Sequence, residues 1–165
     1  MKYISDVREL PELVFWTMGG LSNVSWLGIG LMFIASFSGF LIMMRFAWEL
    51  NVMSSGEETA LSLGVNYKFI TRIFFVTATL MTATAVSFTG VIGFVGLIAP
   101  HITTMLFGGD YRYNIPASCL FGALLLLLSD TLSRVVIAPS ELPVGVITSL
   151  IGVPFFIYLI IRRKK

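Results

Sequence analysis

The sequence predicts an all-α integral membrane protein with about five transmembrane helices. Of its 165 residues, 56% are hydrophobic and 12% are charged, and the mean hydropathy is +0.90, whereas soluble domains are about 25% charged. The uncharged segments are continuously apolar rather than alternating, which favours helices over the strands of a barrel. Four of them are long enough, or nearly so, to cross about 30 Å of hydrocarbon: residues 13–44, 73–109, 113–129 and 142–161.

The first segment, residues 13–44, is longer than one crossing needs. Its beginning, from Phe15 to Trp26, is rich in the aromatic and polar side chains that are typical of the membrane interface. We therefore expect an interfacial turn near residues 18–25 and one crossing over about 26–44.

The segment 73–109 crosses the membrane either once or twice, and the basic residues favour two crossings. If the segment breaks near residues 88–90, eight of the eleven Lys and Arg residues share one side of the membrane, which the positive-inside tendency makes the cytoplasmic side. These eight are Arg45, Lys68, Arg72, Arg112, Arg162, Arg163, Lys164 and Lys165. The C-terminus is then cytoplasmic. The predicted crossings are about 26–44, 71–88, 91–107, 114–132 and 144–161, of which 71–88 and 91–107 are short.

Residues 45–70 form the one extended polar section, which we expect to be a cytoplasmic loop. Within it, residues 54–64 are typical of a short helix with a serine cap, Glu57 and Glu58 in the first turn and Gly64 as the stop. Its apolar residues have two interpretations: they pack on the helix ends or the membrane surface, or they form a docking helix for a partner. These apolar residues are Leu61, Leu63 and Val65.

Small residues and prolines gather in the third and fifth predicted crossings. Gly90, at the predicted break, and Gly93 and Gly96 allow close helix packing, and Pro100 removes a backbone donor and should kink its helix. The small face of the fifth crossing either lines a pathway or packs against a neighbour. It begins after Pro143 and includes Gly145, Thr148, Gly152 and Pro154.

Asp130 and Arg134 lie four positions apart near the outer end of the fourth crossing, and so share one helical face. They form either a local ion pair or a functional contact. Ionisable groups at membrane depth tend to be functional, but the position near a helix end weakens that argument here.

The sequence offers no catalytic constellation that we could identify. His101 is the single histidine, so no histidine pair can bind a metal within this chain, and we expect it to be structural. A phosphate-binding loop of the Gly-x-x-x-x-Gly-Lys-Ser/Thr type is absent, so we expect no ATP to be bound by that route. The scattered basic residues and a net charge of +2 give no support for nucleic-acid binding.

Five ordered motifs resemble the permeases of ABC importers for iron-siderophore complexes, haem and vitamin B12, the FecCD-type family. They are FWTMGG at residues 15–20, GEETA at 56–60 followed by LGV at 63–65, GFVGLIAPH at 93–101, ELPVG at 141–145 and GVPFF at 152–156. The resemblance covers nearly the whole chain. It implies a membrane-embedded importer subunit that is not itself an enzyme, with ATP and Mg bound by a separate ATPase subunit.

The resemblance also implies roles for residues. The segment from Gly56 to Val65 would be the coupling helix that docks on the ATPase subunit, with Gly56, Glu57, Glu58, Thr59, Ala60, Leu63 and Gly64 at or near the contact. Arg134, with Asp130, would meet an acidic residue of the soluble binding protein. Two permease copies would form a homodimer around a path that residues 144–157 approach.

Permeases of this family have about ten crossings, and the chain resembles only their C-terminal half. It is therefore interpreted as half of such a permease: a fragment, one chain of a split permease, or a truncated fragment without transport activity. An independent small channel is a further alternative.

Overall fold

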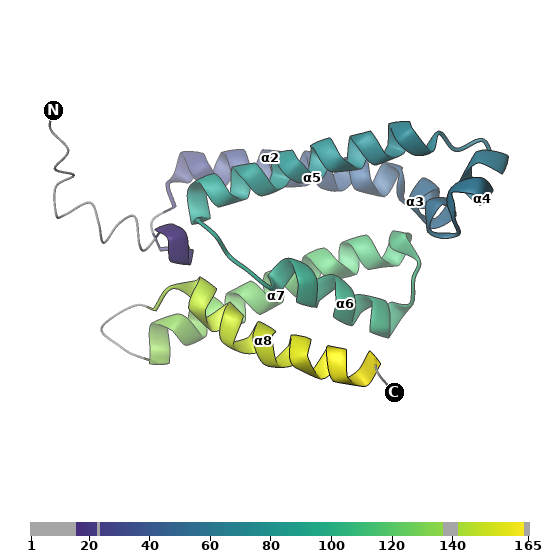
Figure 1. The fold of residues 1–165 in the computed structure, drawn as a ribbon. Helices are drawn as coiled ribbons and strands as arrows, with labels where there is room; N and C mark the ends of the chain where they lie inside the picture. Colours follow the sequence, from purple (N-terminus) through teal and green to yellow (C-terminus); the bar gives the residue numbers. More distant parts are fainter. Residues whose placement is uncertain (1–15, 23, 137–141, 164–165) are drawn as a thin grey trace, which may run out of the picture. The chain divides into compact units, whose positions relative to one another are not determined.

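The computed structural model describes residues 16–22, 24–136 and 142–163, and every regular element in these ranges is a helix (Figure 1). This confirms the predicted all-α class. The helices are α2 (Trp26–Arg45), α3 (Ala47–Ser54), α4 (Glu57–Ser62), α5 (Tyr67–Thr89), α6 (Val95–Phe107), α7 (Tyr111–Val136) and α8 (Val144–Arg163). Among the described residues, α2, α5 and α7 are long and apolar enough to cross a membrane, while α6 and α8 are shorter apolar helices.

The contacts divide the chain into two units, which are described separately. One contains residues 25–85 and 99–121; the other contains the described residues within 1–24, 86–98 and 122–165.

In the first unit, α2 begins as predicted at Trp26, where the Ser25 hydroxyl accepts a hydrogen bond from the Gly28 amide at 3.1 Å. The buried Gly39 of α2 lies against Met81 of α5, and a Cβ at Gly39 would be only 2.7 Å from the Met81 Cγ. A glycine thus lets the two long helices approach closely, as small residues do in membrane helix pairs.

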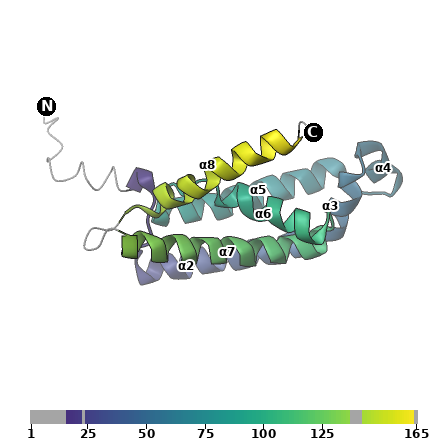
Figure 2. The same ribbon diagram turned by 90° about the horizontal axis from the view of Figure 1, so that it is seen from below.

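Helices α3 and α4 lie together at the end of α5 from which that helix starts, as both views show (Figure 1, Figure 2). The predicted loop 45–70 is therefore mostly helical. The serine cap predicted for α4 is wrong: Ser54 ends α3, and the N-cap of α4 is Gly56, which has no side chain to cap the helix. The predicted stop at Gly64 agrees with the structure.

The long uncharged segment 73–109 is interrupted at residues 90–94, slightly after the predicted break near residues 88–90. Helix α5 extends to Thr89 and α6 begins only at Val95, so five residues between them are not helical. Consequently α5, with 23 residues, is longer than the predicted crossing 71–88, and α6, with 13 residues, is shorter than the predicted crossing 91–107.

Helix α7 is also longer than the predicted crossing 114–132. It starts at Tyr111, directly after the turn that contains Gly108 and Asp110, and it carries Pro116 in its second turn. Helix α8 starts at Val144, the first residue of the predicted crossing 144–161, and extends to Arg163.

Candidate functional site

The ends of α4 are shaped by two glycines with positive φ. Gly56, at φ 111°, leads into the helix, and Gly64, at φ 76°, follows it. The Gly64 amide donates to the Leu61 carbonyl at 3.0 Å, and the Val65 amide donates to the Ala60 carbonyl at 2.9 Å. This is the paired arrangement that closes many helices at a left-handed glycine.

Helix α4 has one buried and one exposed face. Ala60, with no exposed surface, and Val65 form a small core with Ile70. This core is covered by Phe46, Val52, Met53, Tyr67 and Phe74. Of the two interpretations of the apolar residues in this segment, packing and partner docking, packing therefore applies to Val65.

The other face of α4 is exposed. Leu61 and Leu63 are 59% and 57% exposed, and Glu57 and Glu58 are exposed beside them. Thr59 is also exposed, and its hydroxyl donates to the Ser55 carbonyl at 3.3 Å. Two large apolar side chains next to two acids make a surface suited to a partner with an apolar groove and basic residues.

Three glycines bring separate segments of the second unit into backbone contact. Gly90 packs on the Trp16 carbonyl, Gly19 on the Val91 carbonyl and Gly145 on the Met18 carbonyl, and a Cβ at any of them would collide with backbone. We call Gly19, Gly90 and Gly145 the glycine junction. Two hydrogen bonds accompany it: the Gly20 amide donates to the Thr89 carbonyl at 2.9 Å, and the Gly145 amide donates to the Gly19 carbonyl at 3.4 Å.

A hollow of about 660 Å³ lies beside the glycine junction. Its lining is mostly apolar and comes from residues 17–18, from Val91 and Gly93, and from one side of α8. Among the predicted pathway residues, it is lined by Gly93, Gly145 and Pro154.

The remaining pathway residues lie elsewhere. Thr148 is fully buried and its hydroxyl donates to the Gly145 carbonyl at 3.0 Å. It is therefore a packing residue and does not line the hollow. Gly152 is buried against Phe94. Pro143 directly precedes α8, and its carbonyl accepts from the Val146 amide at 3.0 Å.

Gly96 and Pro100 both lie within α6 and are exposed. Gly96 has open space where a side chain would be. The Pro100 carbonyl accepts hydrogen bonds from the hydroxyls of Thr103 at 3.1 Å and Thr104 at 2.7 Å. His101 lies on the same helix and is exposed.

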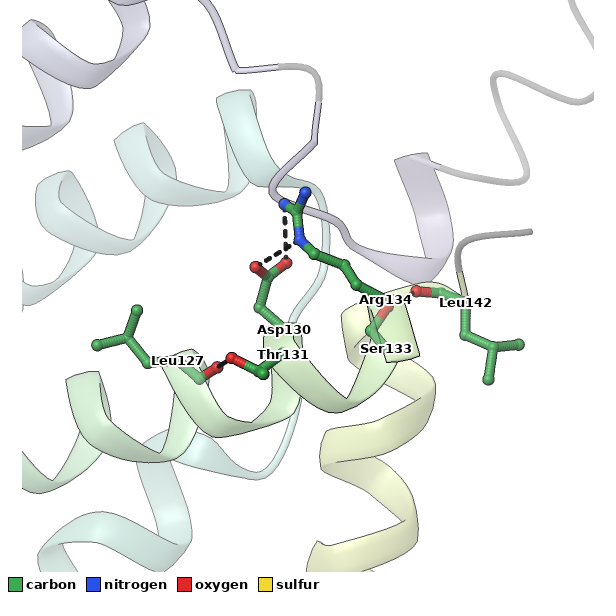
Figure 3. A network of polar contacts seen from close by, with 6 residues as sticks. All are labelled: Leu127, Asp130, Thr131, Ser133, Arg134 and Leu142. Atoms are coloured by element: carbon green, nitrogen blue, oxygen red, sulfur yellow. Dashed lines mark hydrogen bonds and ion pairs between the residues drawn. The ribbon is translucent and has the colours of Figure 1, made fainter. Parts of the chain in front are cut away.

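Asp130 and Arg134 form the local ion pair that their spacing allows (Figure 3). The Arg134 Nε donates to Asp130 Oδ2 at 2.9 Å, and Nη2 donates to Oδ1 at 3.4 Å. The Arg134 side chain is 49% exposed and the Asp130 side chain 22%. The preceding residue, Ser133, donates to the carbonyl of Leu142, just before α8. The guanidinium is thus held by a carboxylate of its own helix, with about half of the side chain exposed.

Three features of these regions were not predicted from the sequence. Gly19 was not assigned a role, and Gly90 was expected to suit close packing, but its partner, the Trp16 backbone, was not predicted. Phe94 has a φ of 65°, which no sequence pattern indicates for a phenylalanine. Asn51 and Asp110 form a hydrogen bond across 59 positions; an acid after two glycines is a helix-cap signal for Asp110, but nothing in the sequence pairs it with Asn51.

Within the described residues, no cluster of three or more His, Cys, Asp or Glu side chains could hold a metal ion. The regions described above therefore offer surfaces and packing, without a recognisable metal centre.

Comparison with known proteins relates the chain to transporters. A family described as the FecCD transport family matches residues 1–162. The chain is 45% identical, over 100% of its length and 47% of the relative's, to a putative ABC transporter permease protein of Methanocaldococcus jannaschii. It is 42% identical to the iron(3+)-hydroxamate import system permease protein FhuB of Bacillus subtilis, over 97% of the chain and 41% of the relative.

A third relative, the hemin transport system permease protein HmuU of Yersinia pestis, is 37% identical over 100% of the chain and 49% of its own length. A solved structure, described as an inward-facing conformation of a putative metal-chelate type ABC transporter, superposes with a TM-score of 0.86 at 34% identity, over 97% of this chain and 52% of that one. The chain thus spans about half the length of the proteins it matches. These relatives are transporter permeases rather than enzymes, in agreement with the expectation for this chain.

Proposed function

Because the chain belongs to the FecCD transport family, we propose that it forms the C-terminal half of the transmembrane subunit of an ATP-driven importer. The cargo would be an iron-siderophore complex, haem or a cobalamin. The observation that carries this proposal is the match of 97% of the chain, at a TM-score of 0.86, to a metal-chelate type ABC transporter. Iron-hydroxamate and hemin permeases among the relatives support the substrate class.

The chain is a multi-pass membrane protein, and we propose five crossings by α2, α5, α6, α7 and α8. The C-terminus would lie in the cytoplasm together with α3, α4 and the turn at Asp110. The distribution of the basic residues supports this orientation. The short α6, which at about 1.5 Å per residue covers roughly 20 Å, would cross with the help of the non-helical residues before it.

The exposed face of α4 would dock on the ATPase subunit. Gly56 and Gly64 set the ends of the helix, Ala60 anchors it to the core, and Glu57, Glu58, Thr59 and Leu63 would contact or flank the partner. ATP and Mg would bind to that ATPase, with no cofactor held by this chain. Acids beside exposed leucines suit a groove that is apolar at its centre and basic at its rim.

On the outer side, Arg134 would meet an acidic residue of a soluble binding protein. Its bidentate bond to Asp130 orients the guanidinium while leaving it half exposed, which lowers the entropy lost on docking.

The hollow beside α8 would border the translocation path. Its apolar lining suits a bulky chelate, and a second permease copy would supply the opposite wall. Residues of the permease half that this chain does not contain would complete the enclosure.

The docking role of α4 is tested by co-purifying the full chain with its ATPase subunit in detergent. Changing Glu57→Arg and Glu58→Arg together should abolish the association, because both acids are exposed and their reversal opposes a basic rim. Ser22→Arg is the matched control: it adds a positive charge at an exposed residue on the proposed outer side and should leave the association intact. Undiminished binding by the Glu57/Glu58 variant would overturn the docking role.

A further inference from the structure

The side chain of Asn51, in α3, joins the cytoplasmic helices to the start of α7. Its Nδ2 donates to Asp110 Oδ1 at 2.6 Å, and its Oδ1 accepts from the Tyr111 amide at 2.8 Å. The same Asp110 oxygen accepts from the Arg112 amide at 2.9 Å, which caps α7. Asn51 thus uses both the donor and the acceptor of its amide group, which a carboxylate, lacking a donor, cannot do.

On its other side, α3 is packed against α4. Val52 and Met53, the two residues that follow Asn51, cover the core formed by Ala60, Val65 and Ile70. A displacement of α4 therefore acts through this core on the segment that carries Asn51.

The α6–α7 turn, in turn, is tied to both of its helices. The Asn114 side chain donates to the Thr104 hydroxyl at 3.0 Å and to the Gly108 carbonyl at 2.9 Å. The hydroxyls of Thr103 and Ser118 are 2.8 Å apart and share a hydrogen bond. Thr103 is 1% exposed and Asn114 is 7% exposed, so water does not compete readily for these bonds. A displacement of Asp110 therefore acts on α6 as well as on α7.

We propose that Asn51 is a positioning residue that transmits movement of α4 to the α6–α7 hairpin, so that binding of the ATPase subunit on α4 is felt at the turn from Gly108 to Asn114. The inference rests on the proposed docking of the ATPase on α4. It adds a specific route. Movement of α4 reaches the α6–α7 turn through the Asn51 side chain, in addition to acting on α5, the helix that follows α4 in the chain.

The test is amide hydrogen exchange of the full chain in lipid nanodiscs, with and without the ATPase subunit. In the unchanged chain, the ATPase should slow exchange in residues 56–65 and also in residues 108–114, the latter by about fivefold, as expected when one hydrogen-bonded link is stabilised. With Asn51→Ala, the slowing at 56–65 should remain while that at 108–114 is lost.

A control and a rescue separate this role from a general loss of structure. Asn66→Ala removes another side-chain cap in the same region, the bond from the Phe69 amide at 3.1 Å, without touching Asp110, and should leave the response at 108–114 unchanged. Asn51→Asp alone should abolish the response, since it faces Asp110 with a second carboxylate. Asn51→Asp combined with Asp110→Asn exchanges the donor and acceptor groups and should restore part of the response; the recovery is incomplete because the Arg112 amide shares the Asp110 oxygen whose position the new donor would take.

The outcomes distinguish the two proposals. If the ATPase fails to slow exchange at 56–65 in the unchanged chain, the proposed docking of α4 is wrong and the inference falls with it. If 56–65 is protected but 108–114 responds equally in the unchanged chain and in Asn51→Ala, the docking stands and the role of Asn51 is overturned.

Discussion

The ring of Phe94, at the start of α6, lies directly on Gly152 of α8. A Cβ at Gly152 would be 2.7 Å from the Phe94 Cδ1 and closer still to its Cβ and Cγ. Phe94 has a φ of 65°, in the left-handed region that costs an ordinary residue about 1–2 kcal/mol. The glycine on α8 therefore provides the space that a strained phenylalanine occupies, which explains why the small face of α8 is partly a packing surface.

Gly152→Ala should destabilise the protein by about 1–3 kcal/mol, because the added methyl collides with Phe94. The midpoint of thermal unfolding in detergent measures the loss. Gly30→Ala in α2, where nothing lies within 4 Å of the added atom, is the matched control and should be neutral or slightly stabilising.

The same collision predicts that the stability effects of changes at Phe94 and Gly152 are not additive in a double-mutant cycle. Phe94→Gly removes the ring, the Cβ and the strain of a positive φ, so Gly152→Ala should cost much less in that background. An equal cost in both backgrounds would show that the two residues do not interact in the folded protein.

The glycine junction predicts that alanine substitution has very different effects on stability at two glycines of the predicted pathway set. Gly145→Ala should cost about 1–3 kcal/mol, because its Cβ would meet the backbone at Met18, which cannot rotate away as a side chain does. Gly96→Ala should be neutral or stabilising by up to about 1 kcal/mol, since its site is open and alanine favours a helix. Chemical denaturation of both variants in the same detergent compares them; similar losses would argue against the junction.

Gly64→Ala should destabilise the end of α4 by about 1–2 kcal/mol, because its φ of 76° is unfavourable for any residue with a Cβ. Gly109→Ala is its control: this glycine also lies in a turn with nothing within 4 Å, but it is not among the positive-φ glycines. Hydrogen exchange of residues 57–65 should rise in the first variant and stay unchanged in the second.

The stability of the α6–α7 turn should depend on pH through Asp110. The hydrogen bond from the Arg112 amide, followed by that from the Asn51 side chain, lowers the pKa of Asp110 from its ordinary value of 3.8. Because the folded-state pKa is the lower one, the carboxylate stabilises the fold at neutral pH, and this contribution is lost as the pH falls below 3.8. The unfolding midpoint at neutral pH and in acid measures it.

Asp110→Asn is the matching variant for that titration. It should be less stable than the unchanged chain at neutral pH, and the difference between the two proteins should shrink in acid, since both side chains are then uncharged. A difference that is the same at both pH values would contradict the role of the Asp110 charge.

Arg134→Ala should weaken binding of the soluble binding protein while changing stability by no more than about 1 kcal/mol, because the ion pair with Asp130 is partly exposed. Binding to the chain in nanodiscs should also fall with added salt, as screening requires. Thr131→Ala, an exposed change on the same turn of α7, is the control. If Arg134→Ala binds as tightly as the unchanged chain, the pair is local only.

The local features of the fold could be predicted from the sequence. Continuous apolar segments determined the helical class, Gly64 marked the end of α4, and the spacing of Asp130 and Arg134 predicted a pair that the structure confirms at 2.9 Å. Each depends on residues within a few positions of one another, where helix geometry alone sets the distance.

Only the tertiary structure decided the contacts between distant segments. The five non-helical residues before Val95 follow from the packing of Gly90 on Trp16 and of Phe94 on Gly152. The bond between Asn51 and Asp110 joins residues 59 positions apart. Such contacts depend on which helices approach and in what register, and a single sequence carries no local signal for either. The apolar pattern therefore determined that this chain consists of membrane helices, whereas the close approach of particular glycines, a strained phenylalanine and one amide side chain decided how the segments within each unit are joined.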